Sequence, residues 1–161
     1  MNFLNKIEKF NPNICFIDEN EKKVLYKNVL IKSETLSKNL KSRSLIFVLA
    51  QNHTEFFTGY ISFFKKGLVQ MLLDPKISIG PLKELIETYI PNYIFLPNSR
   101  SNDLKNYEVL TELNNHVILK LNQDNFYSVN KDLILLLSTS GSTGSKKFVR
   151  ISYENIYKNI K

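Results

Sequence analysis

Short apolar runs that contain almost no polar residues are the feature of this sequence that most constrains its fold. They lie at residues 45–50, 68–73, 93–96 and 133–137. A strand with one wet face alternates apolar and polar residues, whereas a strand covered on both faces reads as a continuous apolar run and is typical of parallel sheets. We therefore expect these runs to be buried strands of a largely parallel sheet.

The segments between the first three runs have the spacing of amphipathic helices. We predict helices over residues 28–41, 54–66 and 79–90, with Thr54 as an N-cap. Aromatic and aliphatic side chains in the second helix share one face, which we interpret as core packing: Phe56, Phe57, Tyr60, Ile61 and Phe64. Alternating strands and helices predict an α/β fold, a mixed, largely parallel sheet flanked by helices.

The remaining segments give weaker signals. Residues 14–17 and 24–26 flank a polar stretch and predict a hairpin. Leu104, Val109, Leu110 and Leu113 allow a short helix within 99–115, and residues 117–121 favour a strand. After a last strand over 148–151, Ser152 is a suitable N-cap for a helix that begins at residue 153.

The length of 161 residues suits one domain, and we assign residues 1–161 to it. The composition, 43% hydrophobic and 23% charged, is that of a globular protein. No apolar stretch is long enough to span a bilayer, and the N-terminus does not have the pattern of a signal peptide, so we expect a cytoplasmic location. The single cysteine and the two histidines lack ligand spacing, so no metal site made of protein side chains is expected.

The stretch 138–145 consists only of Ser, Thr and Gly, and Lys146 and Lys147 follow it. Glycine lets a ligand approach the main chain, hydroxyl groups donate hydrogen bonds to anionic oxygens, and lysine supplies a mobile positive charge. A flexible linker is the alternative interpretation. The tract is short, however, and strand-like residues flank it on both sides, which favours a loop held between strands that binds a polyphosphate. The spacing excludes a Walker A loop.

The residues from Thr139 to Lys147, followed by Val149 and by the run 152–156, resemble the signature loop of the adenylate-forming enzymes. These enzymes include acyl-CoA synthetases, the adenylation domains of nonribosomal peptide synthetases, and luciferase. Lys146 stands where the family usually has Pro, Phe148 where it has Gly, and Tyr153 where His is common. The order of the expected elements also resembles the N-terminal subdomain of these ligases.

The resemblance implies carboxylate activation, in which a substrate carboxylate and ATP form an acyl-adenylate and pyrophosphate, followed by transfer to CoA, a carrier-protein thiol or an amine. It assigns the ATP phosphates to one set of residues: Thr139, Ser140, Gly141, Ser142, Thr143, Gly144 and Lys147. The family's catalytic lysine and its Mg²⁺ ligand belong to later segments, so neither is expected here. The apolar pattern continues up to Lys161, so we expect the sequence to be truncated inside its last helix and inactive alone.

Two other classes of function stay open. One is a non-catalytic module that binds nucleotides or phosphate. The other is a nucleic-acid-binding domain, which the net charge of +7 invites. Such domains are enriched in arginine on one element, because the guanidinium makes bidentate contacts. Only three arginines, Arg43, Arg100 and Arg150, are present among the 22 basic residues, and these are scattered, so we do not expect nucleic-acid binding.

Overall fold

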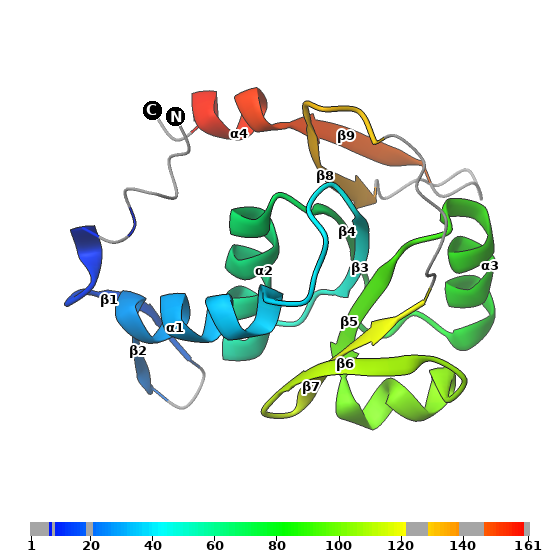
Figure 1. Cartoon of the computed structure of the whole chain (residues 1–161), viewed down its shortest axis with the longest axis horizontal. Coiled ribbons are helices and arrows are strands. Elements are labelled where there is room, and N and C mark those ends of the chain that lie inside the picture. The colour runs from blue at the N-terminus through cyan, green and yellow to red at the C-terminus, as the bar shows by residue number, and fades with distance from the viewer. Residues whose placement is uncertain (1–6, 8, 19–20, 122–128, 139–146, 160–161) are drawn as a thin grey trace.

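A computed structural model describes the chain except for residues 1–6, 8, 19–20, 122–128, 139–146 and 160–161. Its main feature is a seven-stranded sheet in the order β6-β7-β5-β3-β4-β8-β9. Helices cover the sheet on both sides (Figure 1). The predicted α/β class and the mixed, largely parallel sheet are therefore confirmed.

The apolar runs of the sequence form the parallel centre of the sheet. The four strands are β5 (Tyr93–Pro97), β3 (Leu45–Leu49), β4 (Val69–Leu73) and β8 (Leu133–Ser138). Each pairs in parallel with its neighbour in that order. The side chains of β3 are 0–4% exposed, as expected for a strand with both faces covered.

Antiparallel strands extend this centre on both sides. β7 (His116–Lys120) pairs with β5, and β6 (Glu108–Leu113) pairs with β7. At the other side, β9 (Phe148–Ser152) pairs with β8. Outside the sheet, β1 (Ile14–Ile17) and β2 (Lys23–Leu25) form the predicted hairpin.

The helices predicted over residues 28–41, 54–66 and 79–90 and from residue 153 are present at approximately these places. They are α1 (Tyr26–Ser37), α2 (Thr54–Lys66), α3 (Ile79–Tyr89) and α4 (Tyr153–Asn159). α2 ends at Gly67, whose positive φ of 77° suits glycine in a left-handed cap. The predicted cap of α4 is confirmed, because Ser152 Oγ accepts a hydrogen bond from the Asn155 N–H group at 3.1 Å.

One prediction about α2 is wrong, and a second is confirmed only in part. Its N-cap is His53, with no side-chain cap bond, and Thr54 is its first residue. Of the predicted aromatic face, Phe64 is buried and Phe56 and Tyr60 pack against core clusters, whereas Phe57 is 37% exposed. The rest of the buried face is made by Phe63 and by the small residues Thr58, Gly59 and Ser62. The small side chains let α2 approach the sheet closely. A Cβ atom at Gly59 would lie 2.7 Å from the ring of Phe95.

The short helix that Val109, Leu110 and Leu113 allowed is also wrong, because these residues lie in β6. A 3-10 helix, η2 (Asn98–Leu104), occupies the preceding segment. The deciding signal is the two-residue turn between β6 and β7, where Asn114 adopts a φ of 51°. Asparagine tolerates this left-handed backbone, so the turn fixes a hairpin in place of a helix.

Two hydrophobic clusters lie on opposite faces of the central strands. Leu36 of α1 and Phe63 of α2 pack with Phe95 on one face. Leu82 and Ile86 of α3 pack with a separate set on the other face. A third, smaller cluster joins Phe64 of α2 to β8 and α4. The parallel centre of the sheet is therefore enclosed on both sides.

Candidate functional site

The strands on either side of the Ser/Thr/Gly tract form an antiparallel pair. Ser138, at the end of β8, lies opposite Phe148, at the start of β9. Because β8 is parallel to β3, β4 and β5, the tract follows the carboxyl end of a central strand. Open α/β sheets bind ligands beyond these ends. The strand flanks predicted from the sequence are therefore present, and their pairing holds the two ends of the tract close together.

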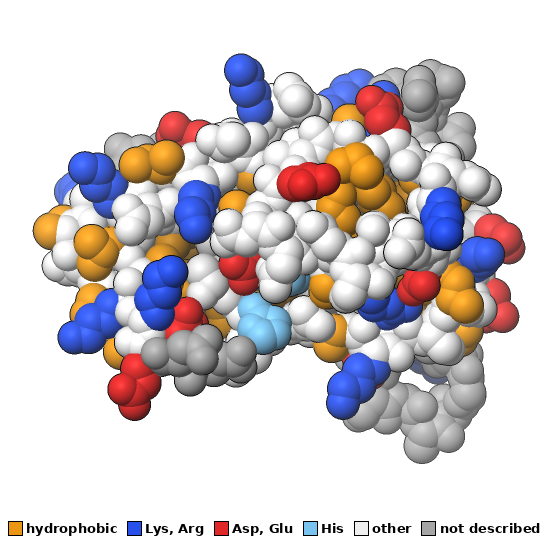
Figure 2. Space-filling view, turned by 90° about the horizontal axis from the view of Figure 1, so that it is seen from below, with side chains coloured by type: hydrophobic (Ala, Val, Ile, Leu, Met, Phe, Trp, Pro, Cys, Tyr) orange, Lys and Arg blue, Asp and Glu red, His pale blue; other side chains and the backbone are white. Residues whose placement is uncertain are grey.

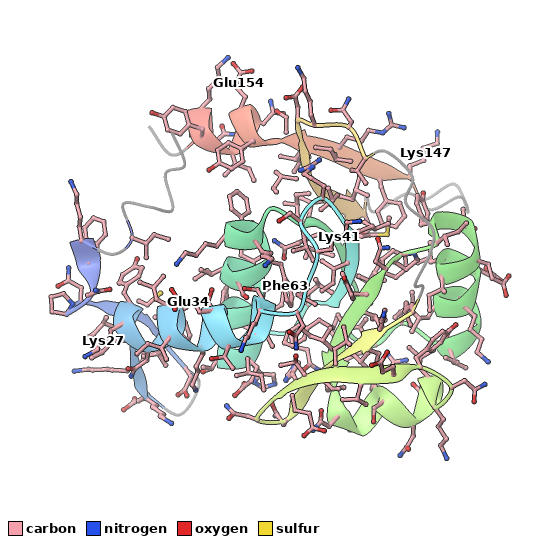
Figure 3. All side chains as sticks on the ribbon, viewed as in Figure 1. Lys27, Glu34, Lys41, Phe63, Lys147 and Glu154 are labelled. Carbon is pink, nitrogen blue, oxygen red and sulfur yellow. The ribbon has the colours of Figure 1, made fainter. Side chains whose placement is uncertain are left out.

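Most of the predicted phosphate-binding residues lie outside the described residues. These are Thr139, Ser140, Gly141, Ser142, Thr143 and Gly144. Lys147 is described, and its side chain is exposed directly before β9 begins. Figure 3 shows it at the edge of the molecule, beside the helix α3. Its role in binding phosphates stays a prediction.

A cleft of about 870 Å³ includes Lys147 and runs along β8 and β9. Its floor is apolar and includes Leu133, Leu136 and Phe148, while Tyr89 of α3 closes one side. The rings of Tyr89 and Phe148 meet edge to face, with centroids 5.5 Å apart. The cleft therefore combines an apolar floor with a rim of charged and polar groups.

Hydrogen bonds fix the far end of this cleft. The guanidinium of Arg43 donates to the backbone oxygens of Asn130 and Leu133, and so ties the start of β8 to the loop before β3. The backbone N–H of Tyr153 donates to the oxygen of Asp132 at 3.0 Å. Both sets of bonds lie at the end of the β8–β9 pair where Leu133 is opposite Ser152, so this end is attached to its surroundings.

Arg150 is a cleft residue to which the sequence assigned no role. Its side chain is exposed, and it makes no hydrogen bond or ion pair with the described residues. Residues two apart on a strand face the same side. Alternation along β9 therefore places Arg150 on the same face as Phe148. The sequence could have identified Arg150 as a cleft residue only if Phe148 had already been known to line the cleft.

A second cleft, of about 460 Å³, lies between the β1–β2 hairpin, α1 and the start of α2. Its rim mixes three lysines with Asp18 and Glu55. The Glu55 carboxylate accepts a hydrogen bond from Asn114 Nδ2 at 2.6 Å. The rim therefore carries both positive and negative charges, and one of its carboxylates already accepts a hydrogen bond from the protein. These features do not favour any particular class of ligand for this cleft.

Membrane and metal features are absent from the described part of the chain. No helix there is long and apolar enough to cross a bilayer. Within the same residues, no three His, Cys, Asp or Glu side chains gather where they could hold a metal ion. On the face in Figure 2, basic and acidic side chains are interspersed.

Comparison with known proteins shows what this chain is similar to in sequence and in fold. No protein-family model matches the chain. It is 27% identical over 162 residues to an enniatin synthetase of Fusarium oxysporum, a match that covers 94% of this chain and 5% of the relative. The chain thus spans about a twentieth of the length of that curated relative.

The fold matches solved structures over nearly its whole length. Apo MatB from Rhodopseudomonas palustris aligns with a TM-score of 0.74 and 14% identity, covering 98% of this chain and 36% of MatB. The O-succinylbenzoate coenzyme A synthetase of Bacillus subtilis, solved with AMP, aligns with a TM-score of 0.68 and 17% identity, covering 98% and 44%. These neighbours are adenylate-forming enzymes. The chain has the fold of their N-terminal subdomain, and the resemblance predicted from its sequence is confirmed.

Proposed function

We propose that this chain is the N-terminal portion of an ATP-dependent carboxylate-activating ligase, and that its Ser/Thr/Gly tract binds the phosphates of ATP. The observation that carries the proposal is the position of the tract. It joins the carboxyl end of a central strand to an antiparallel partner in a fold shared with adenylate-forming enzymes. The enniatin synthetase relative favours an adenylation domain of the peptide-synthetase type.

Each part of the tract has a chemical role in this proposal. Thr139, Ser140, Ser142 and Thr143 offer hydroxyl and backbone N–H donors to the β- and γ-phosphates. Gly141 and Gly144 let the main chain come close to the phosphate oxygens. The ammonium group of Lys147 pairs with the negative charge of these phosphates. Charge-assisted hydrogen bonds of this kind are each worth about 1.5–3 kcal/mol.

The reaction requires control of negative charge. The substrate carboxylate attacks the α-phosphorus of ATP, the bond to the bridging oxygen breaks, and pyrophosphate leaves with the electron pair. Donors aimed at the departing phosphates stabilise the charge that develops as this bond breaks. Holding pyrophosphate is the part of the reaction that we assign to this chain.

The other parts of the chemistry we assign to sequence beyond it. We propose that the Mg²⁺ ligands, the adenine and acyl pockets and the catalytic lysine lie there. Because only phosphate contacts are left, we expect this chain alone to form no adenylate and to bind ATP with a dissociation constant of about a millimolar or weaker. Residues 1–161 then act as one subdomain of a longer enzyme.

Calorimetric and NMR titrations of the chain test the phosphate assignment. ATP and inorganic tripolyphosphate should bind with similar affinity, and adenosine should not compete. Lys147→Ala should weaken both by about tenfold, the value of one charge-assisted contact. Lys27→Ala is the matched control, because Lys27 is an exposed lysine on α1, far from Lys147 (Figure 3). Equal binding by Lys147→Ala, or competition by adenosine, contradicts the proposal.

Activity is tested in a longer protein that contains this sequence. Pyrophosphate exchange measured with fatty, aryl and amino acids identifies the carboxylic acid, and Lys147→Ala should reduce that exchange. A non-catalytic nucleotide-binding module would bind ATP but would show no pyrophosphate exchange with any of the acids. A nucleic-acid-binding domain would instead shift DNA or RNA in a gel with steep salt dependence.

A further inference from the structure

Two aromatic rings meet beside Lys147, the one residue of the candidate phosphate site that the structure describes. Phe148 follows Lys147 directly as the first residue of β9, and Tyr89 is the last residue of α3. Their rings meet edge to face, with centroids 5.5 Å apart and planes inclined by 79°. Both side chains are partly buried against the hydrophobic cluster that α3 covers. The strand residue next to Lys147 is therefore packed against the end of a helix.

The end of α3 gives Tyr89 a fixed support. The helix ends at Ile90, which adopts a left-handed φ of 46° and donates its backbone N–H to the oxygen of Ile86 at 2.8 Å. A β-branched residue rarely adopts this conformation, so the surrounding structure must hold it. Asn92 does so from two residues further on. Its backbone N–H donates to the oxygen of Leu45 at 2.9 Å, and its side-chain oxygen accepts the Leu45 N–H at 3.2 Å.

The sheet restrains Phe148 from its other side. Phe148 lies opposite Ser138, the last residue of β8, and β8 in turn pairs with β4. Lys147 and Phe148 line the larger cleft together with Tyr89. Phe148 is partly buried there, whereas Lys147 is exposed. The backbone of Lys147 is thus joined to an anchored residue, while its side chain stays exposed at the cleft.

The sequence departs from the family pattern on both sides of this lysine. Lys146 stands where the family usually has Pro, and Phe148 where it usually has Gly. Proline fixes φ and so reduces the conformational entropy that ordering removes, which lysine does not. Glycine has no side chain to pack, whereas Phe148 contacts Tyr89. This chain therefore lacks a local restraint before the lysine and has a tertiary contact after it.

We propose that Tyr89 and Phe148 are positioning residues for the phosphate site. Their contact holds the backbone of Lys147, so that its ammonium group meets the phosphates of ATP in a preorganised position. Part of the entropy cost of ordering Lys147 is then incurred on folding and not on binding. Neither ring touches the ligand in this proposal. The inference rests on the proposed function.

NMR titrations of the whole chain with tripolyphosphate test the pair. Phe148→Ala and Tyr89→Leu should each weaken binding by about threefold to fivefold, within the range of an aromatic contact. Tyr89→Phe keeps the ring and should bind as the unchanged chain does. Phe57→Leu is the matched control, because its ring also packs on a neighbour, Phe16, at 5.5 Å. β1 and α3 lie at opposite sides of the molecule (Figure 1), so this control should not change the affinity.

A double-mutant cycle shows whether the pair acts through Lys147. In the Lys147→Ala background, Phe148→Ala should change tripolyphosphate affinity by less than about 1.5-fold, because the group that the rings position is absent. A purely structural loss would weaken binding by the same factor in both backgrounds. Equal factors in the two backgrounds, or a loss in Tyr89→Phe as large as that in Tyr89→Leu, overturn the proposal.

Amide relaxation of the chain without ligand separates this proposal from the phosphate assignment. The order parameter of the Lys147 amide should fall in Phe148→Ala and Tyr89→Leu but not in Tyr89→Phe or Phe57→Leu. An order parameter that is the same in all four variants rejects the positioning role, whether or not tripolyphosphate binds. Lowered order with no tripolyphosphate binding by the unchanged chain would instead reject the proposed function, and with it the use of this contact for a phosphate.

Discussion

The central strand β3 and the β9–α4 region beside the tract differ in sequence and in burial, because β3 is entirely apolar whereas β9 and α4 mix apolar with polar and charged residues. In β3 each side chain is at most 4% exposed, with helices on both sides. In β9, Val149 is 47% exposed and Arg150 points into an open cleft. The candidate phosphate tract belongs to the second region. The comparison teaches that the stability of the fold and the candidate function are located in different parts of the molecule.

The largest difference between the regions should appear when one phenylalanine is truncated in each. Phe63 is fully buried, and its ring meets that of Phe95 edge to face at 5.2 Å. Phe63→Ala should cost about 3–5 kcal/mol of unfolding free energy. Phe148→Ala should cost about 1 kcal/mol, mainly its contact with Tyr89. Urea unfolding measures both. Similar losses would mean that the two regions are equally packed.

A glycine pair sharpens the comparison within the central region. Gly59→Ala would place a Cβ atom 2.7 Å from the buried ring of Phe95. We expect a loss of about 1–3 kcal/mol from overpacking, reduced by the better helix propensity of alanine. Gly80→Ala is the control, because nothing outside its chain neighbours and its own helix lies within 4 Å of its Cβ position. The helix propensity of alanine is offset by the restriction that Pro81 places on the residue before it, so we expect a change of less than about 1 kcal/mol. Thermal unfolding of both variants distinguishes the two sites.

The pH dependence of stability tests the central region at His116, the first residue of β7. Burial lowers the pKa of His116, which is 1% exposed; the nearby Glu55 carboxylate opposes this shift and His53 adds to it. Below the unfolded pKa of about 6.5, the unfolded chain binds a proton that the folded chain does not. Stability should therefore fall as the pH drops below that value, by at most about 1.4 kcal/mol per pH unit. His116→Gln should flatten this dependence, as measured by urea unfolding at several pH values. An unchanged slope would contradict it.

Sequence alone predicted most of the fold because its strands are continuous apolar runs, as in residues 45–49, and its helices are periodic. It predicted the strand flanks of the tract for the same reason. It missed the small-residue face of α2, since only packing against Phe95 shows why Gly59 lies inward. It missed Arg150, because the face of a strand residue depends on pairing that local sequence does not encode.

The smallest effect should come from the cap of α4, and it tests whether the second region unfolds separately. Ser152 Oγ accepts a hydrogen bond from the Asn155 N–H group, and Asn155 Oδ1 accepts one from the Ser152 N–H group at 3.0 Å. Ser152→Ala should cost about 1 kcal/mol, the usual value of an N-cap. Because no residue of α4 is buried, the loss should be confined to local opening. Hydrogen exchange should then accelerate in α4 and β9 but not in β3, and Ser152→Thr should restore the slower rate. Faster exchange in β3 as well would show that the two regions unfold as one cooperative unit, and the stability of the fold could then not be separated from the phosphate tract.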